Sequence, residues 1–222
     1  MNQGKRKPPL PHPSDAPKAV IGRLSLYLRE LDQLVRTGKA TVSSSQLGRS
    51  LGCSDAQVRK DLANFGHFGH PGIGYRCAEL VAAIRRILGT DREWTVALVG
   101  VGNLGRALLG YKGFAAKGFR FVAAFDVDAR KTGGSIDGIP IYGMNRLTEI
   151  VKRHHIQLAM VSVPASAAQE VAEVLAATGI SGIVNFSPIR LTLGDDVRLV
   201  GVDLATELEL LAFSVANRTN SR

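Results

Sequence analysis

The sequence predicts an α/β protein of two domains, because two kinds of hydrophobic pattern follow one another along the chain. Between 17 and 90, apolar residues recur at helical spacing. These positions include Ile21, Leu24, Leu28, Leu31 and Val35. From 94 onward, short apolar runs such as WTVALVG, FRFVAAFD, IQLAMVSVP and SGIVNF alternate with amphipathic segments, which indicates parallel strands joined by crossover helices. We therefore expect a helical domain over 17–90 and a parallel-sheet domain over 91–203.

The composition limits the class of protein. Of the 222 residues 45% are apolar, enough to fill the cores of two small domains and to exclude disorder for most of the chain. No apolar run approaches the ~18 residues that a membrane span needs. The start, MNQGKRKPPLPHPSD, is basic and proline-rich without an apolar core, which indicates a disordered tail over 1–16 and not a signal peptide. With two cysteines and no export signal, we expect a cytoplasmic protein with reduced thiols.

The positive charge is concentrated in the first domain. Residues 1–90 contain 14 Lys and Arg against 6 Asp and Glu, a net charge of +8. Residues 91–222 contain 14 against 13, a net charge of +1, so the two parts sum to the +9 of the whole chain. A solvated basic surface would give the same count, but such asymmetry favours a nucleic-acid partner for the first domain.

Two short helices are predicted between 43 and 65. Ser43 with Gln46 forms a capping box that begins the first helix, and Gly52 ends it. Ser54 with Gln57 forms a second capping box two residues later. Two helices joined by a tight glycine-containing turn are typical of a helix-turn-helix.

The second of these helices carries the side chains that we expect to meet DNA. Its buried stripe is Val58, Leu62 and Phe65, which leaves amide and cationic side chains on the opposite face, where they can bond base edges and phosphates in a major groove. The glycine-rich stretch FGHFGHPGIGYR that follows fits the hairpin of a winged helix. The candidate DNA-binding residues are Ser43, Ser54, Gln57, Arg59, Lys60, Asn64, His67 and Tyr75.

A zinc site is the competing interpretation of this region. Its ligands would be Cys53, His67, His70 and Cys77, but apart from H-x-x-H their spacing matches no common ligand pair. We therefore expect no metal.

The second domain begins with a dinucleotide-binding fingerprint. The strand TVALVG leads into a G-x-G-x-x-G turn and a helix, and a second strand ends at Asp126, 21 residues past the last glycine. The glycines let the backbone approach a pyrophosphate at the helix N-terminus, and Asp126 would accept hydrogen bonds from the ribose hydroxyls, which favours NAD(H) over NADP(H). The fingerprint residues are Gly100, Val101, Gly102, Asn103, Leu104 and Gly105. This is a Rossmann-like arrangement.

A dehydrogenase would need an acid–base residue beside the nicotinamide. The other strand ends offer Pro164, Asn185 and Phe186, which supply shape and hydrogen bonds but no such group. We therefore expect a sensor and not an enzyme, with an uncharged pocket near Pro164 and Phe186 that prefers the neutral ring of NADH. A dehydrogenase and a CoA-binding or structural module remain the alternatives.

The last predicted element is an amphipathic helix over 204–217. Its apolar stripe is Leu204, Leu208, Leu211 and Val215. This stripe packs either on the protein's own sheet or on a second copy of the chain, which a DNA-binding dimer would need.

These elements, in this order, resemble the Rex family of bacterial NADH-responsive transcriptional repressors. The resemblance covers roughly 17–217 and is carried by motifs such as IGRLSLYLREL, QVRKDLANFGHFGHPGIGY, VALVGVGNLGRALLGYKGF, VPASAAQEV, GIVNFSP and VDLATELELL. It implies a homodimer that exchanges its terminal helix, binds a palindromic double-stranded operator when NAD⁺ dominates, and releases it when NADH rises. It also implies a switch formed by Arg29, Tyr111 and Asp203. The sequence departs from the family pattern at His67, His70 and Ser187.

Overall fold

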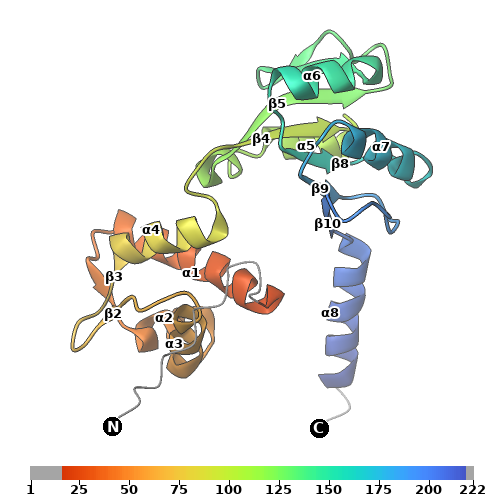
Figure 1. The fold of residues 1–222 in the computed structure, drawn as a ribbon. Coiled ribbons are helices and arrows are strands. Elements are labelled where there is room, and N and C mark those ends of the chain that lie inside the picture. The colour runs from red at the N-terminus through yellow and green to blue at the C-terminus, as the bar shows by residue number, and fades with distance from the viewer. Residues whose placement is uncertain (1–16, 219–222) are drawn as a thin grey trace, which may run out of the picture. The chain divides into compact units, whose positions relative to one another are not determined.

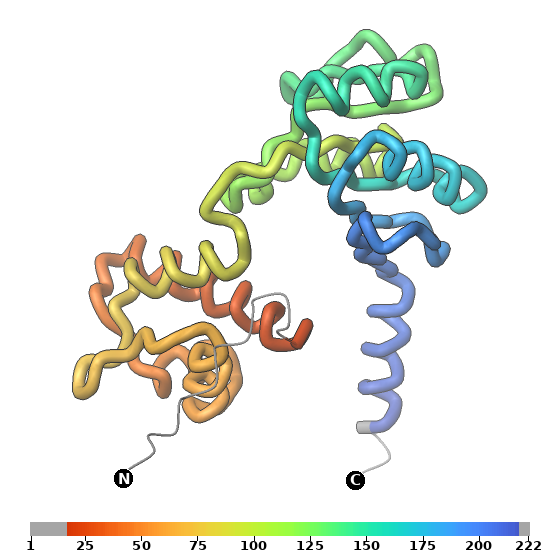
Figure 2. Tube along the Cα trace, viewed as in Figure 1, coloured from red at the N-terminus to blue at the C-terminus, as the bar shows by residue number. Residues whose placement is uncertain are grey.

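The computed structural model describes residues 17–218, and the chain divides into two units between Arg92 and Glu93. Figures 1 and 2 show the two units along the chain. The tail expected over 1–16 lies outside the described residues. Each unit has its own hydrophobic core, so each is described separately.

The first unit is a winged helix-turn-helix, as predicted. Its three-stranded antiparallel sheet has the order β1-β3-β2, and the hairpin of β2 and β3 forms the wing. Its core contains Leu24, Leu31, Leu47, Leu62 and Ile84, all at most 2% exposed. The elements are α1 (Lys18–Arg36), β1 (Thr41–Val42), α2 (Ser44–Leu51), α3 (Asp55–Ala63), β2 (Gly69–His70), β3 (Gly74–Arg76) and α4 (Cys77–Leu88).

Local sequence explains where α2 and α3 begin. At Ser43 the predicted capping box is complete, since its side chain accepts from the Gln46 amide and the Gln46 side chain accepts from the Ser43 amide. At Ser54 the second capping box is only half formed. The Ser54 hydroxyl accepts from the Gln57 amide at 3.1 Å, but the Gln57 side chain turns toward Asp61 instead of returning to Ser54. The helix still begins where expected, because one cap suffices.

The second unit is a seven-stranded sheet with the order β10-β9-β8-β4-β5-β7-β6. Every pairing is parallel except that of the edge strand β6 with β7. Its strands are β4 (Trp94–Val99), β5 (Phe119–Asp126), β6 (Ser135–Ile136), β7 (Ile139–Gly143), β8 (Leu158–Val161), β9 (Gly182–Asn185) and β10 (Arg198–Gly201). Its helices before α8 are α5 (Asn103–Gly110), η2 (Ala115–Lys117), η3 (Met144–Arg146), α6 (Leu147–Arg153) and α7 (Ala165–Ala177).

The strand order fixes where a ligand can bind. β4 lies between β5 and β8, so the chain leaves β4 toward one side of the sheet and later crosses to the other. In open α/β sheets, ligands bind beyond the carboxyl ends of the strands at this reversal. The glycine-rich turn follows β4 at that point.

The last helix, α8 (Leu204–Arg218), does not pack on its own sheet. Every residue whose exposure is described in this helix is exposed, although it carries large apolar side chains. Those more than half exposed are Leu204, Leu208, Leu210, Leu211, Phe213 and Val215. Figure 2 shows α8 extending from the end of β10. Of the two predicted arrangements, packing on the protein's own sheet is therefore wrong.

Candidate functional site

The three glycines of the turn after β4 differ in how closely other atoms pack around them. Gly100 has φ +96°, and a Cβ there would lie 2.5 Å from the carbonyl oxygen of Ser162. A Cβ on Gly105 would overlap the carbonyl oxygen of Gly100. A Cβ on Gly102, by contrast, would meet nothing within 4 Å. Gly100 and Gly105 are thus needed for packing, whereas the space at Gly102 stays open for a ligand.

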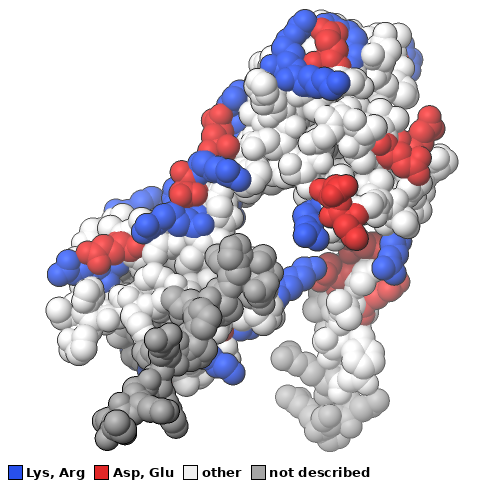
Figure 3. Space-filling model, viewed as in Figure 1, with Lys and Arg blue, Asp and Glu red and all other residues white. Residues whose placement is uncertain are grey.

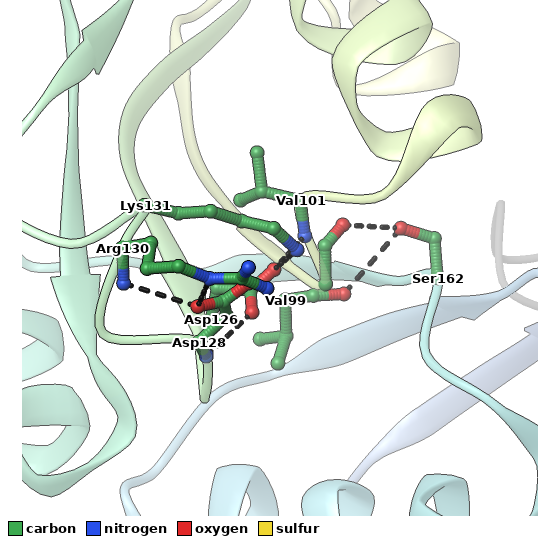
Figure 4. Close-up of polar contacts among 8 residues, drawn as sticks. Val99, Val101, Asp126, Asp128, Arg130, Lys131 and Ser162 are labelled. Atoms are coloured by element: carbon green, nitrogen blue, oxygen red, sulfur yellow. Dashed lines mark hydrogen bonds and ion pairs between the residues drawn. The ribbon is translucent and has the colours of Figure 1, made fainter.

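Asp126 lies at the end of β5, beside this turn (Figure 4). Its carboxylate is 7% exposed and accepts hydrogen bonds from the Val101 amide, the Asp128 amide and the Lys131 ammonium, each at 2.8 Å. Burial raises the pKa of Asp126, but the hydrogen bonds lower it by a larger amount. The net shift is downward, so the carboxyl group is ionised. The Val101 amide, predicted as a cofactor contact, is therefore committed to Asp126.

Lys131 neutralises part of the charge at Asp126, with its Nζ 2.8 Å from Oδ2. Repulsion of a 2′-phosphate by Asp126 was expected to select NAD(H), but the Lys131 ammonium offsets this negative charge. Arg130 similarly pairs with Asp128 at 2.9 Å and helps to lower the pKa of that carboxyl to about 2. Simple repulsion by one carboxylate is thus an incomplete basis for cofactor choice.

A cavity of about 350 Å³ adjoins the turn and the Asp126 carboxylate. The Ser162 hydroxyl donates to the Gly100 carbonyl at 2.8 Å and holds the turn against β8 (Figure 4). The residues around the cavity include Gly100, Gly102, Asp126, Val127, Ser162 and Pro164. Pro164 therefore lies in the wall of this cavity, and its contact with a cofactor stays a prediction.

Asn185 and Phe186 do not line this cavity. Asn185 is 4% exposed and its amide bonds its own turn, donating to the carbonyls of Ser187 and Ile189 and accepting from the Ser187 amide. The polar atoms of Asn185 thus close the turn after β9, and its contact with a cofactor stays a prediction. A separate cavity of about 320 Å³ lies between this turn and Asp203.

In the first unit, α3 presents its cations as predicted. Arg59 and Lys60 are exposed, and Arg59 pairs with Asp55 at 2.6 Å and with the Ser44 hydroxyl at 3.0 Å. Gln57 and Asn64 are half-buried. Of the capping serines, Ser43 is half-buried and Ser54 exposed, and His67 is exposed in the wing.

Tyr75 differs from the prediction. Its side chain is 7% exposed and belongs to the core of the first unit. The ring supports the wing from inside and does not present itself to DNA, since the alternation of β3 turns it inward.

The three switch residues of the family pattern lie in different settings. The Asp203 carboxylate caps α8, accepting from the Ala205 amide at 2.9 Å, which holds its pKa below the usual value. Tyr111 is 60% exposed and its ring contacts Phe114 edge to face. Arg29 is exposed on α1 in the other unit. Their mutual contact stays a prediction.

Charges are evenly mixed over parts of the second unit, in keeping with its small net charge. Figure 3 shows basic and acidic side chains side by side around α6, where Glu149 pairs with Arg146 and Arg153. Within residues 17–218, no three His, Cys, Asp or Glu side chains are grouped to hold a metal ion. Among the same residues no helix has the length and apolar character of a membrane span.

Comparison with known proteins covers both units. A model described as a putative DNA-binding protein N-terminus matches residues 15–63, and one described as a CoA binding domain matches 91–189. The redox-sensing transcriptional repressor Rex of Desulfitobacterium hafniense is 45% identical over 91% of this chain and 96% of its own. The Rex of Streptomyces avermitilis is 40% identical over 96% of this chain and 84% of its own.

The chain belongs to the Rex family. Two solved structures of RSP, a Rex-family repressor, match it in fold. The complex with β-NAD⁺ and operator DNA has a TM-score of 0.88 and 33% identity, covering 92% of this chain and 94% of that one. The complex with β-NADH has a TM-score of 0.83 and 32% identity, covering 92% and 96%. The predicted fold class is confirmed, and membership among Rex repressors agrees with the expectation of a sensor and not an enzyme.

Proposed function

We propose that this chain is a transcriptional repressor that senses the balance of NADH and NAD⁺. It binds a palindromic double-stranded operator when NADH is low and releases it when NADH binds. The observation that carries this function is the cavity beside Gly102 and Asp126, in a chain whose other unit is a basic winged helix. A repressor acts where the chromosome is, so we place it in the cytoplasm.

The residues around the cavity fit a dinucleotide. The open space at Gly102 and the N-terminus of α5 at Asn103 suit a pyrophosphate, because a helix N-terminus favours an anion. Asp126 uses three of roughly four lone-pair positions within the protein, which leaves one for a ribose hydroxyl. Pro164 supplies an uncharged wall. Bound NADH or NAD⁺ would contribute the nicotinamide whose charge differs between the two forms.

The first unit would hold DNA through α3 and the wing. Arg59, Lys60 and Asn64 on α3 would contact base edges and phosphates, and His67 would contact the backbone from the wing. A homodimer places two copies of α3 in successive major grooves, which requires a near-palindromic operator. The exposed apolar side of α8 provides the surface on which the second copy packs. Arg29, Tyr111 and Asp203 would couple the cofactor to the DNA-binding units.

Operator binding with and without NADH tests this function. Duplexes selected by the full-length protein from a randomised library in NAD⁺ would be labelled and titrated with protein at rising NADH. We expect NADH to weaken binding about 100-fold, equivalent to ~2.7 kcal/mol, and bound duplex to weaken NADH binding by the same factor. Equal affinity with and without NADH would refute the sensor function.

A second measurement separates NADH from CoA, since one matching model bears the name of a CoA binding domain. NADH should raise the melting temperature of the second unit, whereas CoA should not. The reverse result would contradict dinucleotide sensing.

A further inference from the structure

A buried carboxylate lies on the inner side of α3. Asp61 falls between Val58 and Leu62 in the core of the first unit and is 1% exposed. A buried charge destabilises a protein unless it is paired and hydrogen-bonded. Asp61 meets this condition with four hydrogen bonds from three side chains, so its place among apolar residues needs a reason beyond packing.

Two of the three partners come from α1. The Arg23 guanidinium donates from Nε to Oδ2 at 2.5 Å and from Nη2 to Oδ1 at 2.8 Å, a bidentate pair. The Tyr27 hydroxyl, one turn further along α1, donates to Oδ2 at 2.8 Å. Burial raises the pKa of Asp61, but the hydrogen bonds lower it more, so the carboxylate is ionised. Bonds from successive turns of α1 fix both the position and the rotation of α3.

The third partner is Gln57, one turn before Asp61 on α3. Its Nε2 donates to Asp61 Oδ1 at 2.7 Å. An ionised carboxylate only accepts hydrogen bonds, so the amide of Gln57 must turn its nitrogen inward and its oxygen away. These bonds saturate the carboxylate, because both oxygens already accept twice. Asp61 itself therefore has no capacity left for DNA.

The orientation of Gln57 has a chemical meaning. One amide hydrogen of Gln57 bonds Asp61, which leaves Oε1 as an acceptor and the second amide hydrogen as a donor. This pair complements the N6 donor and N7 acceptor of adenine in the major groove. Gln57 is half-buried in the same helix as the exposed Arg59 and Lys60, so it lies at the edge of the side that those cations present.

We propose that Arg23, Tyr27 and Asp61 are positioning residues that hold the amide of Gln57 in the orientation needed to recognise one adenine in each half of the operator. This inference rests on the proposed DNA-binding function and deepens it. Gln57 provides the contact, and the other three act through it.

The test uses the full-length protein and a duplex that it selects from a randomised library. Affinity is measured for that duplex and for variants with each base pair replaced in turn. For Gln57→Ala we expect discrimination to fall about tenfold at one A·T pair per half-site and to be kept elsewhere. Asp61→Asn should reduce discrimination at that same pair, and the double variant should lose no more than Gln57→Ala alone, because both changes remove one effect.

Controls separate positioning from general damage. Lys60→Ala should weaken binding to all duplexes alike, as expected for a phosphate contact. Ser25→Ala, an exposed change on α1, should leave every affinity unchanged. If Asp61→Asn fails to fold, Tyr27→Phe provides the test instead, since it removes one hydrogen bond to Asp61 and keeps the Arg23 pair. Tyr27→Phe must then reduce discrimination at the Gln57 base pair, that is, the pair at which Gln57→Ala loses discrimination.

The outcomes distinguish two failures. If the wild-type protein selects no sequence, the proposed function is wrong. If it selects one, but Tyr27→Phe and Asp61→Asn leave the Gln57 base pair unaffected or lower discrimination evenly over all positions, the positioning role is wrong.

Discussion

Two glycine substitutions in one turn should affect different properties of the protein. Gly102→Ala should impair cofactor binding, whereas Gly105→Ala should impair folding. Gly102→Ala adds a methyl group where nothing lies within 4 Å, at φ −83° and ψ −164°, a conformation open to alanine. Alanine is a poorer N-cap than glycine by roughly 0.5 kcal/mol, but it restricts the unfolded chain by a similar amount. The free energy of unfolding should therefore change by less than about 0.5 kcal/mol.

Gly105→Ala should instead weaken the fold. Its methyl group would overlap the carbonyl oxygen of Gly100 and lie 3.1 Å from Leu98 Cδ2, so the backbone must shift. Such overpacking costs about 1–3 kcal/mol, against roughly 1 kcal/mol gained from helix propensity. The expected net loss is up to about 2 kcal/mol.

Thermal melting with and without NADH measures both effects. At a concentration about 100 times its Kd, NADH stabilises the wild-type protein by ~2.7 kcal/mol. Gly102→Ala should melt at the wild-type temperature without NADH and lose the NADH-dependent increase, because the new methyl group would occupy the space that we assign to the pyrophosphate. Gly105→Ala should melt lower without ligand. A full NADH-dependent increase in Gly102→Ala would refute the assignment of the pyrophosphate to this turn.

Three further results are expected. Asp126→Ala should weaken NADH binding about 10- to 100-fold, by loss of a charge-assisted hydrogen bond, and keep operator affinity; fluorescence titration of NADH checks this, and unchanged affinity would contradict it. Leu208→Glu combined with Leu211→Glu should give monomers in sedimentation that keep the wild-type circular dichroism, since both side chains are exposed within the chain; persisting dimers would exclude α8 as the interface. The pKa of Asp61 is lower in the folded state, so its stabilisation is complete above about pH 4 and is lost as the pH falls further. In urea unfolding between pH 3 and 7, the free energy of unfolding should fall less at acid pH for Asp61→Asn than for the wild-type protein. An equal fall in both proteins would contradict this role of Asp61.

Local signals predicted the helix-turn-helix and the dinucleotide turn from the sequence. The cap at Ser43 and the fingerprint from Gly100 to Gly105 depend on neighbours within a few residues, and such patterns are visible in a sequence. In the structure, the helix cap and the glycine-rich turn occupy the same residues at which the sequence predicts them.

Long-range contacts escaped prediction. Asp61 looks like a surface charge in the sequence, because its partners Arg23 and Tyr27 lie 38 and 34 residues away. Ser162 carries no pattern that marks it, since only the folded sheet brings its hydroxyl to Gly100, 62 residues away. Lys131 lies only five residues after Asp126, but the sequence does not show that the loop after β5 turns its ammonium back to that carboxylate. The bonds that the Asn185 amide makes within its own turn were also not predicted, because the sequence does not show the shape of that turn.

The separate cores of the two units have a genetic consequence. Core substitutions within 24–84 would damage only the first unit and leave the second folded, since no residue is shared between their hydrophobic clusters. Such a chain would still pair with an intact copy through α8 and yield a mixed dimer with one working DNA-binding unit. Alleles of this class should therefore be dominant over the wild type, whereas alleles that prevent pairing should be recessive.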